Sequence, residues 1–185
     1  MTRFTRRRLL AVAAAPAILS ACGNGIGSAG ADRIDARVDS AMRFMHQTLP
    51  GTVTLTEKSS GVLMMPVVTE AGLGLGGAYG RGALKVGGAT VDYYSVTAAS
   101  AGLQIGAQQY SHALFFMTEP ALRAFRASPG WVAGADLEYA VSTYTRTLTA
   151  DTTTLTTPVV AVVFGQAGLI AGASVEGQKY TRILP

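Results

Sequence analysis

The chain has 185 residues, of which 49% are hydrophobic and 14% charged, a balance that suits one globular domain with a sizeable core. Its single cysteine, Cys22, excludes a disulfide framework. Lysine and arginine outnumber aspartate and glutamate by 15 to 11, but four of the basic residues are Arg3, Arg6, Arg7 and Arg8. The rest of the chain therefore has 11 of each sign, which gives no support to a nucleic-acid-binding protein.

The first 21 residues have the three parts of a bacterial export signal. The arginines are followed by an apolar run at 9–19, and Leu19-Ser20-Ala21-Cys22 resembles the lipobox of lipoproteins, in which the cysteine becomes the first mature residue and carries fatty acids such as palmitate. The run is 11 residues long, against the ~20 that a spanning helix needs. TRRRLL at 5–10 fits either twin-arginine or Sec export.

The residues that follow this cysteine bear on location. They are Gly23 and Asn24, without the aspartate that typically retains lipoproteins at the inner membrane. We therefore expect a lipid-anchored protein of the outer membrane that faces the periplasm or the cell surface. Residues 22–30 are rich in glycine and read as a flexible tether to a single domain over 31–185.

A helix is predicted over 32–49, with Asp32 as its N-cap. Its apolar stripe at helical spacing consists of Ile34, Val38, Ala41, Met42, Met45 and Leu49. Three arginines lie off that stripe, at 33, 37 and 43, with Asp35 and Asp39 among them. We prefer a surface helix that packs its stripe on a β core over one that inserts into a membrane.

The centre of the chain reads as consecutive strands. Residues 62–68 form a buried apolar strand in which Pro66 implies an edge or a bulge. Over 72–117 glycines alternate with apolar residues, and the shared parity of Gly72, Gly74, Gly76, Gly80 and Gly82 indicates bent strands or a closely packed backbone. We expect a small closed or nearly closed barrel.

The remaining elements are shorter. We expect a helix over 52–60 and another from 118 to 125 or 127 with Leu122 and Phe125 facing inward. Strand-like alternation returns at 133–142, the threonine-rich stretch at 143–157 reads as a hairpin or loop, and 159–164 with 169–175 reads as a closing hairpin.

Motifs for chemistry are weak. The glycines at 72, 74 and 77 fit a dinucleotide fingerprint only formally, because a strand and not a helix follows them. His46 and His112 lack partners at a metal-ligand spacing, so we read them as a polar helix residue and a strand residue. We expect no enzyme, no cofactor and no metal site.

Several stretches together resemble the SYLF domain family. They are KSSGVLMMP at 58–66, AGLGLGG at 71–77, YGRG at 79–82, GLQIGAQ at 102–108 and GLIAGASVEG at 168–177. The resemblance implies an α+β, mainly β fold, in which a small antiparallel barrel-like core carries about three helices on its surface. It also implies the absence of catalysis and the binding of phosphoinositides or other anionic lipids.

The predicted lipid site combines the basic face of the first helix with cations from the strands. Its members are Arg33, Arg37, Arg43, Lys58, Arg81 and Lys85, with Cys22 as the lipid anchor. The alternative functions are a non-catalytic structural or protein-interaction module of the outer membrane, and an unrecognised enzyme.

Overall fold

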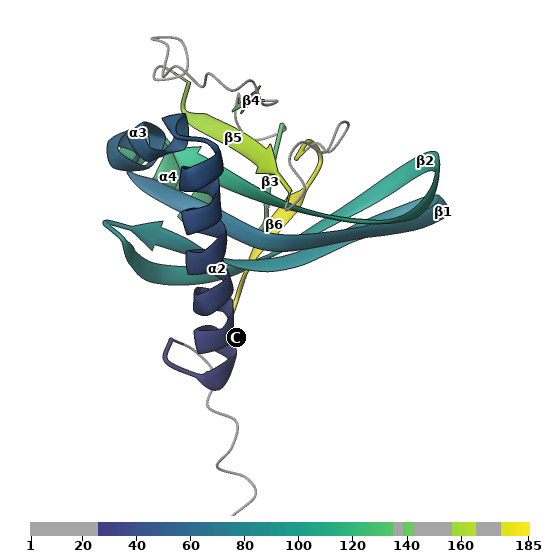
Figure 1. Cartoon of the computed structure of the whole chain (residues 1–185), viewed down its shortest axis with the longest axis horizontal. Helices are drawn as coiled ribbons and strands as arrows, with labels where there is room; N and C mark the ends of the chain where they lie inside the picture. Colours follow the sequence, from purple (N-terminus) through teal and green to yellow (C-terminus); the bar gives the residue numbers. More distant parts are fainter. Residues whose placement is uncertain (1–25, 135–138, 143–156, 166–174) are drawn as a thin grey trace, which may run out of the picture.

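The computed structural model describes residues 26–134, 139–142, 157–165 and 175–185. Its helices are α2 (Ala29–Thr48), α3 (Gly51–Lys58) and α4 (Glu119–Ala127). Its strands are β1 (Gly61–Val86), β2 (Ala89–Phe116), β3 (Trp131–Val132), β4 (Tyr139–Ser142), β5 (Val159–Phe164) and β6 (Lys179–Ile183). These strands form one curled sheet, with α2 lying across it (Figure 1).

Helix α2 begins one turn earlier than predicted. Ser28 is the N-cap, and its side-chain oxygen accepts a hydrogen bond from the backbone amide of Ala31 at 3.0 Å. The prediction of Asp32 as the cap was therefore wrong, because Ala29–Gly30–Ala31 already adopts helical geometry and leaves Asp32 in the first turn. There its negative charge still favours the positive end of the helix dipole.

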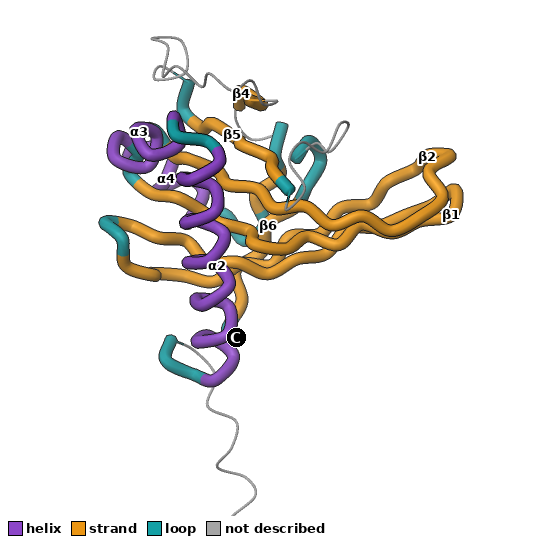
Figure 2. Tube along the Cα trace, viewed as in Figure 1, coloured by secondary structure: helices purple, strands orange, loops and turns teal. Residues whose placement is uncertain are grey.

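Strands β1 and β2 form a single long antiparallel hairpin (Figure 2). The turn is Gly87-Gly88, where positive φ angles of 58° and 83° favour glycine over other residues. The register shifts between Met65 and Val68, on either side of Pro66, which confirms the predicted bulge. The expected series of strands over 62–117 is thus two strands of 26 and 28 residues.

The hairpin folds back on itself, and two glycines permit the crossing of its halves. A Cβ atom on Gly82 would lie 2.0 Å from the carbonyl oxygen of Met64, and one on Gly80 would lie 2.7 Å from that of Val67. Both glycines are buried. The close backbone packing that the glycine pattern predicted is confirmed at these two positions, since any side chain would force the halves apart.

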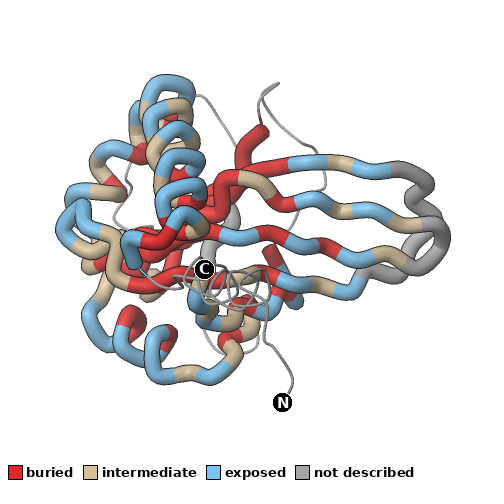
Figure 3. The backbone as a smooth tube through the Cα atoms, turned by 90° about the horizontal axis from the view of Figure 1, so that it is seen from below, coloured by how far each residue is buried: buried red, intermediate tan, exposed pale blue. Residues whose placement is uncertain are grey.

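Two apolar clusters stabilise the sheet, one on each face. The cluster between the halves of the hairpin includes Leu63 and Leu114 and receives Leu122 and Phe125 from α4, as predicted. The other cluster lies under α2. Figure 3 shows that buried residues gather where the helices cover the sheet, whereas exposed and intermediate residues are more frequent along the coloured part of the arm that projects beyond them.

The stripe of α2 packs on this second cluster as expected. Ile34, Val38, Met45 and Leu49 are buried, and Ala41 and Met42 are partly buried against the same cluster. All six residues of strand β5 are apolar because alternate residues enter the two clusters, so that every one of them is buried.

The later strands differ in part from prediction. β4 confirms the end of the strand expected over 133–142, but Ala133 and Gly134 lie in a turn, and β4 pairs with β5 in parallel. β6 was not predicted, and it pairs with both β2 and β3. The stretch at 143–156 and most of the second strand of the closing hairpin lie outside the described residues.

The predicted fold class is confirmed, but the expectation of a closed or nearly closed barrel was wrong, because the described sheet remains open. The sheet curls into a half-barrel, the pairings other than β4–β5 are antiparallel, and three described helices pack on the sheet. This arrangement also decides which charged residues meet, because the N-terminal half of α2 lies against the crossing of β1.

A candidate anion-binding cavity between α2 and β1

A cavity of about 360 Å³ lies between the N-terminal half of α2 and the crossing of β1. It is lined by Gly30, Arg33, Ile34 and Arg37 from the helix and by Pro66, Val67, Thr69, Tyr79, Gly80 and Arg81 from the strand. Three of the six predicted lipid-binding cations therefore line one hollow. The strand residues come from both halves of β1, so the fold-back of the hairpin creates the site.

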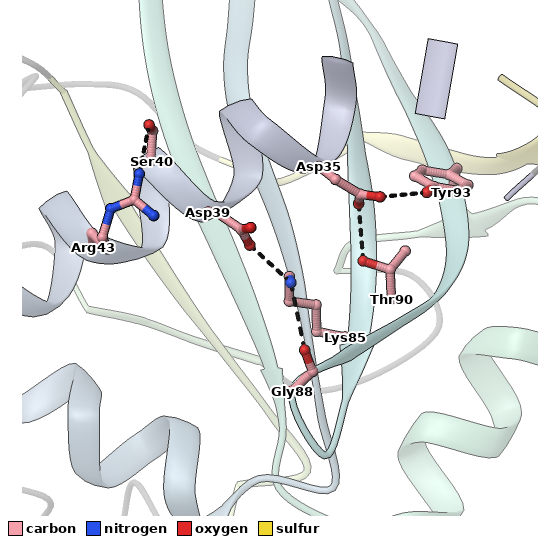
Figure 4. Close-up of polar contacts among 8 residues, drawn as sticks. All are labelled: Asp35, Asp39, Ser40, Arg43, Lys85, Gly88, Thr90 and Tyr93. Atoms are coloured by element: carbon pink, nitrogen blue, oxygen red, sulfur yellow. Dashed lines mark hydrogen bonds and ion pairs between the residues drawn. The ribbon is translucent and has the colours of Figure 1, made fainter. Parts of the chain in front are cut away.

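Two of the three aspartates of α2, Asp35 and Asp39, are held by the sheet (Figure 4). The carboxylate of Asp35 accepts hydrogen bonds from the hydroxyl of Thr90 at 2.9 Å and from that of Tyr93 at 2.7 Å. Burial, assisted by the neighbouring Asp35 carboxylate, raises the pKa of Tyr93 well above its ordinary value, so that hydroxyl stays a donor.

Lys85 is neutralised in the same way. Its ammonium group lies 2.8 Å from the carboxylate of Asp39, and only 14% of its side chain is exposed. Asp35 and Asp39 thus join the helix to the sheet and are not available to the arginines on the cavity side.

The three arginines of the cavity form no ion pair with the described part of the chain. Within the described ranges, no carboxylate lies within 4.0 Å of a side-chain nitrogen of Arg33, Arg37 or Arg81. Arg33 makes one hydrogen bond, from Nε to the carbonyl of Ala29 at 3.0 Å. A small hollow with three guanidinium groups and apolar walls suits a phosphate or carboxylate, because guanidinium binds such groups in a bidentate manner.

The other three predicted cations do not line the cavity. Arg43 hydrogen-bonds Ser40 at 3.1 Å, further along α2, and Lys58 is exposed at the end of α3. Lys85 points to Asp39. The sequence shows that all six are basic, but it does not show which of them share a surface.

Sequence reasoning did not assign Tyr79 to the site. Its side chain is 55% exposed and lines the cavity beside Arg81. The signal was present, because Tyr79 belongs to the YGRG stretch that carries the family resemblance. Tyr79 and Arg81 are exposed and flank a buried glycine, so both lie on the outer face of the strand.

The two histidines lie elsewhere. His46 on α2 hydrogen-bonds Thr56 at 3.0 Å. His112 is fully buried, and its Nε2 lies 2.8 Å from the hydroxyl of Tyr180, which also bonds Gln178. Burial lowers the pKa of His112 to about 3, so its ring is neutral in the core. Over the described ranges, no three His, Cys, Asp or Glu residues gather as a metal site.

A family model matches residues 97–182, and its description is Ysc84, Las17-binding protein actin regulator. The match covers most of β2 and extends into β6. This segment matches the SYLF family. The family contains binding domains, related to lipid binding or to actin regulation, and it is not known for enzymes. No curated protein matches the chain.

The SYLF match and the cavity lie on connected parts of the fold. All of α2 and β1 precede the matched segment, which contains most of β2, the strand that pairs with β1. None of the helices in the described part is long and apolar enough to span a membrane.

Proposed function

We propose that this chain is a lipid-anchored cell-envelope protein whose SYLF-family domain binds the head groups of anionic lipids, including those of the phosphoinositide type. The observation that carries the proposal is the meeting of Arg33, Arg37 and Arg81 at one cavity without a carboxylate partner in the described part. The lipobox at Cys22 and the residues after it support an anchor in the outer membrane.

Charge sets the expected strength of binding. Each arginine near an anionic membrane contributes ~1 kcal/mol, so three together give about 3 kcal/mol, a dissociation constant of several millimolar. The lipid anchor compensates for this weakness, because it holds the domain beside the membrane at a high effective concentration. Exposed cations are screened over ~8 Å at physiological ionic strength, so binding decreases as salt is added.

The test is an NMR titration of the mature chain, residues 22–185 with Cys22→Ser, with a soluble short-chain phosphoinositide at low and high salt. We expect the largest shifts at residues that line the cavity, and weaker binding at high salt. The variant with Arg33, Arg37 and Arg81 changed to Glu should lose most of the binding.

A charge-matched control separates the cavity from a general electrostatic effect. Changing Arg43, Lys58 and Arg123 to Glu alters the net charge equally, at exposed positions outside the cavity. We expect this control to retain most of the binding. Equal loss in both variants would contradict the cavity as the site and favour the wider basic face.

The second candidate function is a non-catalytic protein-interaction module of the envelope. The family description favours it, since it names a protein-binding actin regulator. Failure of the unmodified mature chain to bind any anionic lipid, with an intact fold, would favour this alternative.

A further inference from the structure

Large apolar side chains are exposed at few places in the described part of the chain. They are Ile26 at 70%, Val53 at 38%, Tyr79 at 55% and Leu184 at 79%. Single exposed apolar residues are ordinary, but a group of them beside a charged site indicates a contact surface. Three of these four belong to the neighbourhood of the arginine cavity.

Contacts at the start of α2 bring the segments that carry Ile26 and Leu184 close to one another. The hydroxyl of Ser28 donates to the carbonyl of Pro185 at 3.0 Å, and a Cβ atom on Gly30 would lie 2.9 Å from the same carbonyl carbon. Gly30 also lines the cavity. Ile26 is two residues before Ser28, and Leu184 is next to Pro185, so both belong to the segments that meet near Gly30. Tyr79 lies on the strand wall of the same cavity. Figure 1 shows the C-terminus next to the first turns of α2.

The apolar stripe of α2 is not available for contact with a bilayer. Ile34, Val38 and Met45 are at most 6% exposed, because they pack on the sheet. Insertion of that stripe would expose the second apolar cluster to water. Any apolar contact near the arginines must therefore come from the rim of the cavity.

We infer that the N-terminal end of α2 is a membrane-docking surface, in which Ile26, Tyr79 and Leu184 enter the interfacial layer of an anionic bilayer while the three arginines bind its phosphates. This inference rests on the proposed function, and it specifies the partner as a bilayer surface rather than an isolated head group. Aromatic and aliphatic side chains next to arginine suit that layer, where the rings and stems meet lipid and the charges meet phosphate. The cavity end of the molecule then faces the membrane.

The test compares vesicle binding with head-group binding. The mature chain with Cys22→Ser is sedimented with phosphatidylcholine vesicles that contain phosphatidic acid, and it is titrated separately with glycerol 3-phosphate. The variant Ile26→Ser with Leu184→Ser changes neither the charge nor a residue of the cavity lining. We expect it to lower vesicle binding by roughly tenfold or more, from the lost apolar contact, and to leave glycerol 3-phosphate binding unchanged.

Val53→Ser is the matched control, because Val53 is exposed on α3, which follows the other end of α2. It should bind vesicles as the unmodified chain does. A direct readout comes from Leu184→Trp, whose fluorescence should shift to the blue on vesicles, while Val53→Trp should not shift. The native Trp131 is buried and supplies a constant background.

The outcomes separate this inference from the proposed function. Unchanged vesicle binding by the Ile26/Leu184 variant would overturn the docking surface and leave head-group binding in place. Binding of glycerol 3-phosphate without vesicle binding would also overturn it, and would assign the cavity to a soluble phosphate. If the unmodified chain binds neither probe, the proposed function fails as well.

Discussion

At the scale of single residues, the charges of this protein divide into those that hold the fold and those left for a ligand. Asp92 on β2 is the clearest of the first kind. Its carboxylate is 1% exposed and forms ion pairs with Arg126 of α4, at 2.8 Å, and with Arg182 of β6. It therefore joins three elements that are distant in sequence, whereas the arginines of the cavity have no such partner among the residues that the structure describes.

We expect Asp92→Asn to lower the free energy of unfolding by about 1–3 kcal/mol, the range for losing hydrogen bonds to a charged group. The loss stays moderate because both arginines are partly exposed and water can solvate them again. Chemical denaturation measures this change. Glu119→Gln is the control, since Glu119 and Arg123 form an exposed pair worth at most ~1 kcal/mol. An equal effect of the two substitutions would contradict this account.

At the scale of elements, the long hairpin depends on its glycines at one crossing and not along its whole length. Gly82 faces the backbone of Met64, so a side chain there has no space. Gly77 is exposed, and a Cβ atom on it would make ordinary contact at 3.4 Å with the carbonyl of Ala98. Within one strand, glycine is therefore needed for space at position 82 but not at position 77.

Gly82→Ala should destabilise the fold by about 3 kcal/mol or more, because the added methyl group pushes apart the two halves of β1 at a packed crossing. Gly77→Ala should change the stability by less than ~1 kcal/mol. Thermal unfolding of the two variants gives the comparison. Because the crossing also forms one wall of the cavity, Gly82→Ala should disturb the site as well, and a stable variant with normal ligand shifts would show that the crossing tolerates the methyl group.

At the scale of the whole molecule, the charge balance excludes a general attraction to anionic surfaces. Without the four arginines of the proposed signal, the chain has 11 basic and 11 acidic residues. Binding must then depend on the local grouping of Arg33, Arg37 and Arg81, and lasting membrane association on the anchor that we propose at Cys22. The cavity and the anchor make separable contributions.

Replacing Cys22 with Ala in the full chain, expressed in its native cell type, should release the protein into the soluble periplasmic fraction. The reason is that three cations alone give binding of about 3 kcal/mol, whereas attached acyl chains hold a protein in the bilayer far more strongly. Membrane fractionation measures the outcome. The Arg33/Arg37/Arg81→Glu variant with Cys22 intact should remain in the membrane fraction. Unchanged membrane association of the Cys22→Ala protein would contradict the proposed anchor.

The local elements could be predicted from the sequence because their signals are local. The apolar stripe of the first helix, Pro66 as a bulge, and Leu122 with Phe125 on the buried side of α4 each follow from the spacing of residues along a few turns or pleats. The helix cap was missed by one turn, since Ser28 and Asp32 are both good caps and only the surrounding backbone selects between them. β6 was missed because five residues of mixed polarity carry little pattern of their own.

The sequence by itself determined that this is a mainly β domain with surface helices, with glycines where backbone segments pack closely, and with several arginines that could bind an anion. Only the tertiary structure decided which cations act together. Arg81 and Lys85 lie on the same strand, yet Lys85 meets Asp39 and Arg81 meets the cavity. The physical reason is that a charge is neutralised only by an opposite charge within a few ångströms. In this protein the fold-back of β1 and the position of α2 on the sheet determine which cations have such a neighbour.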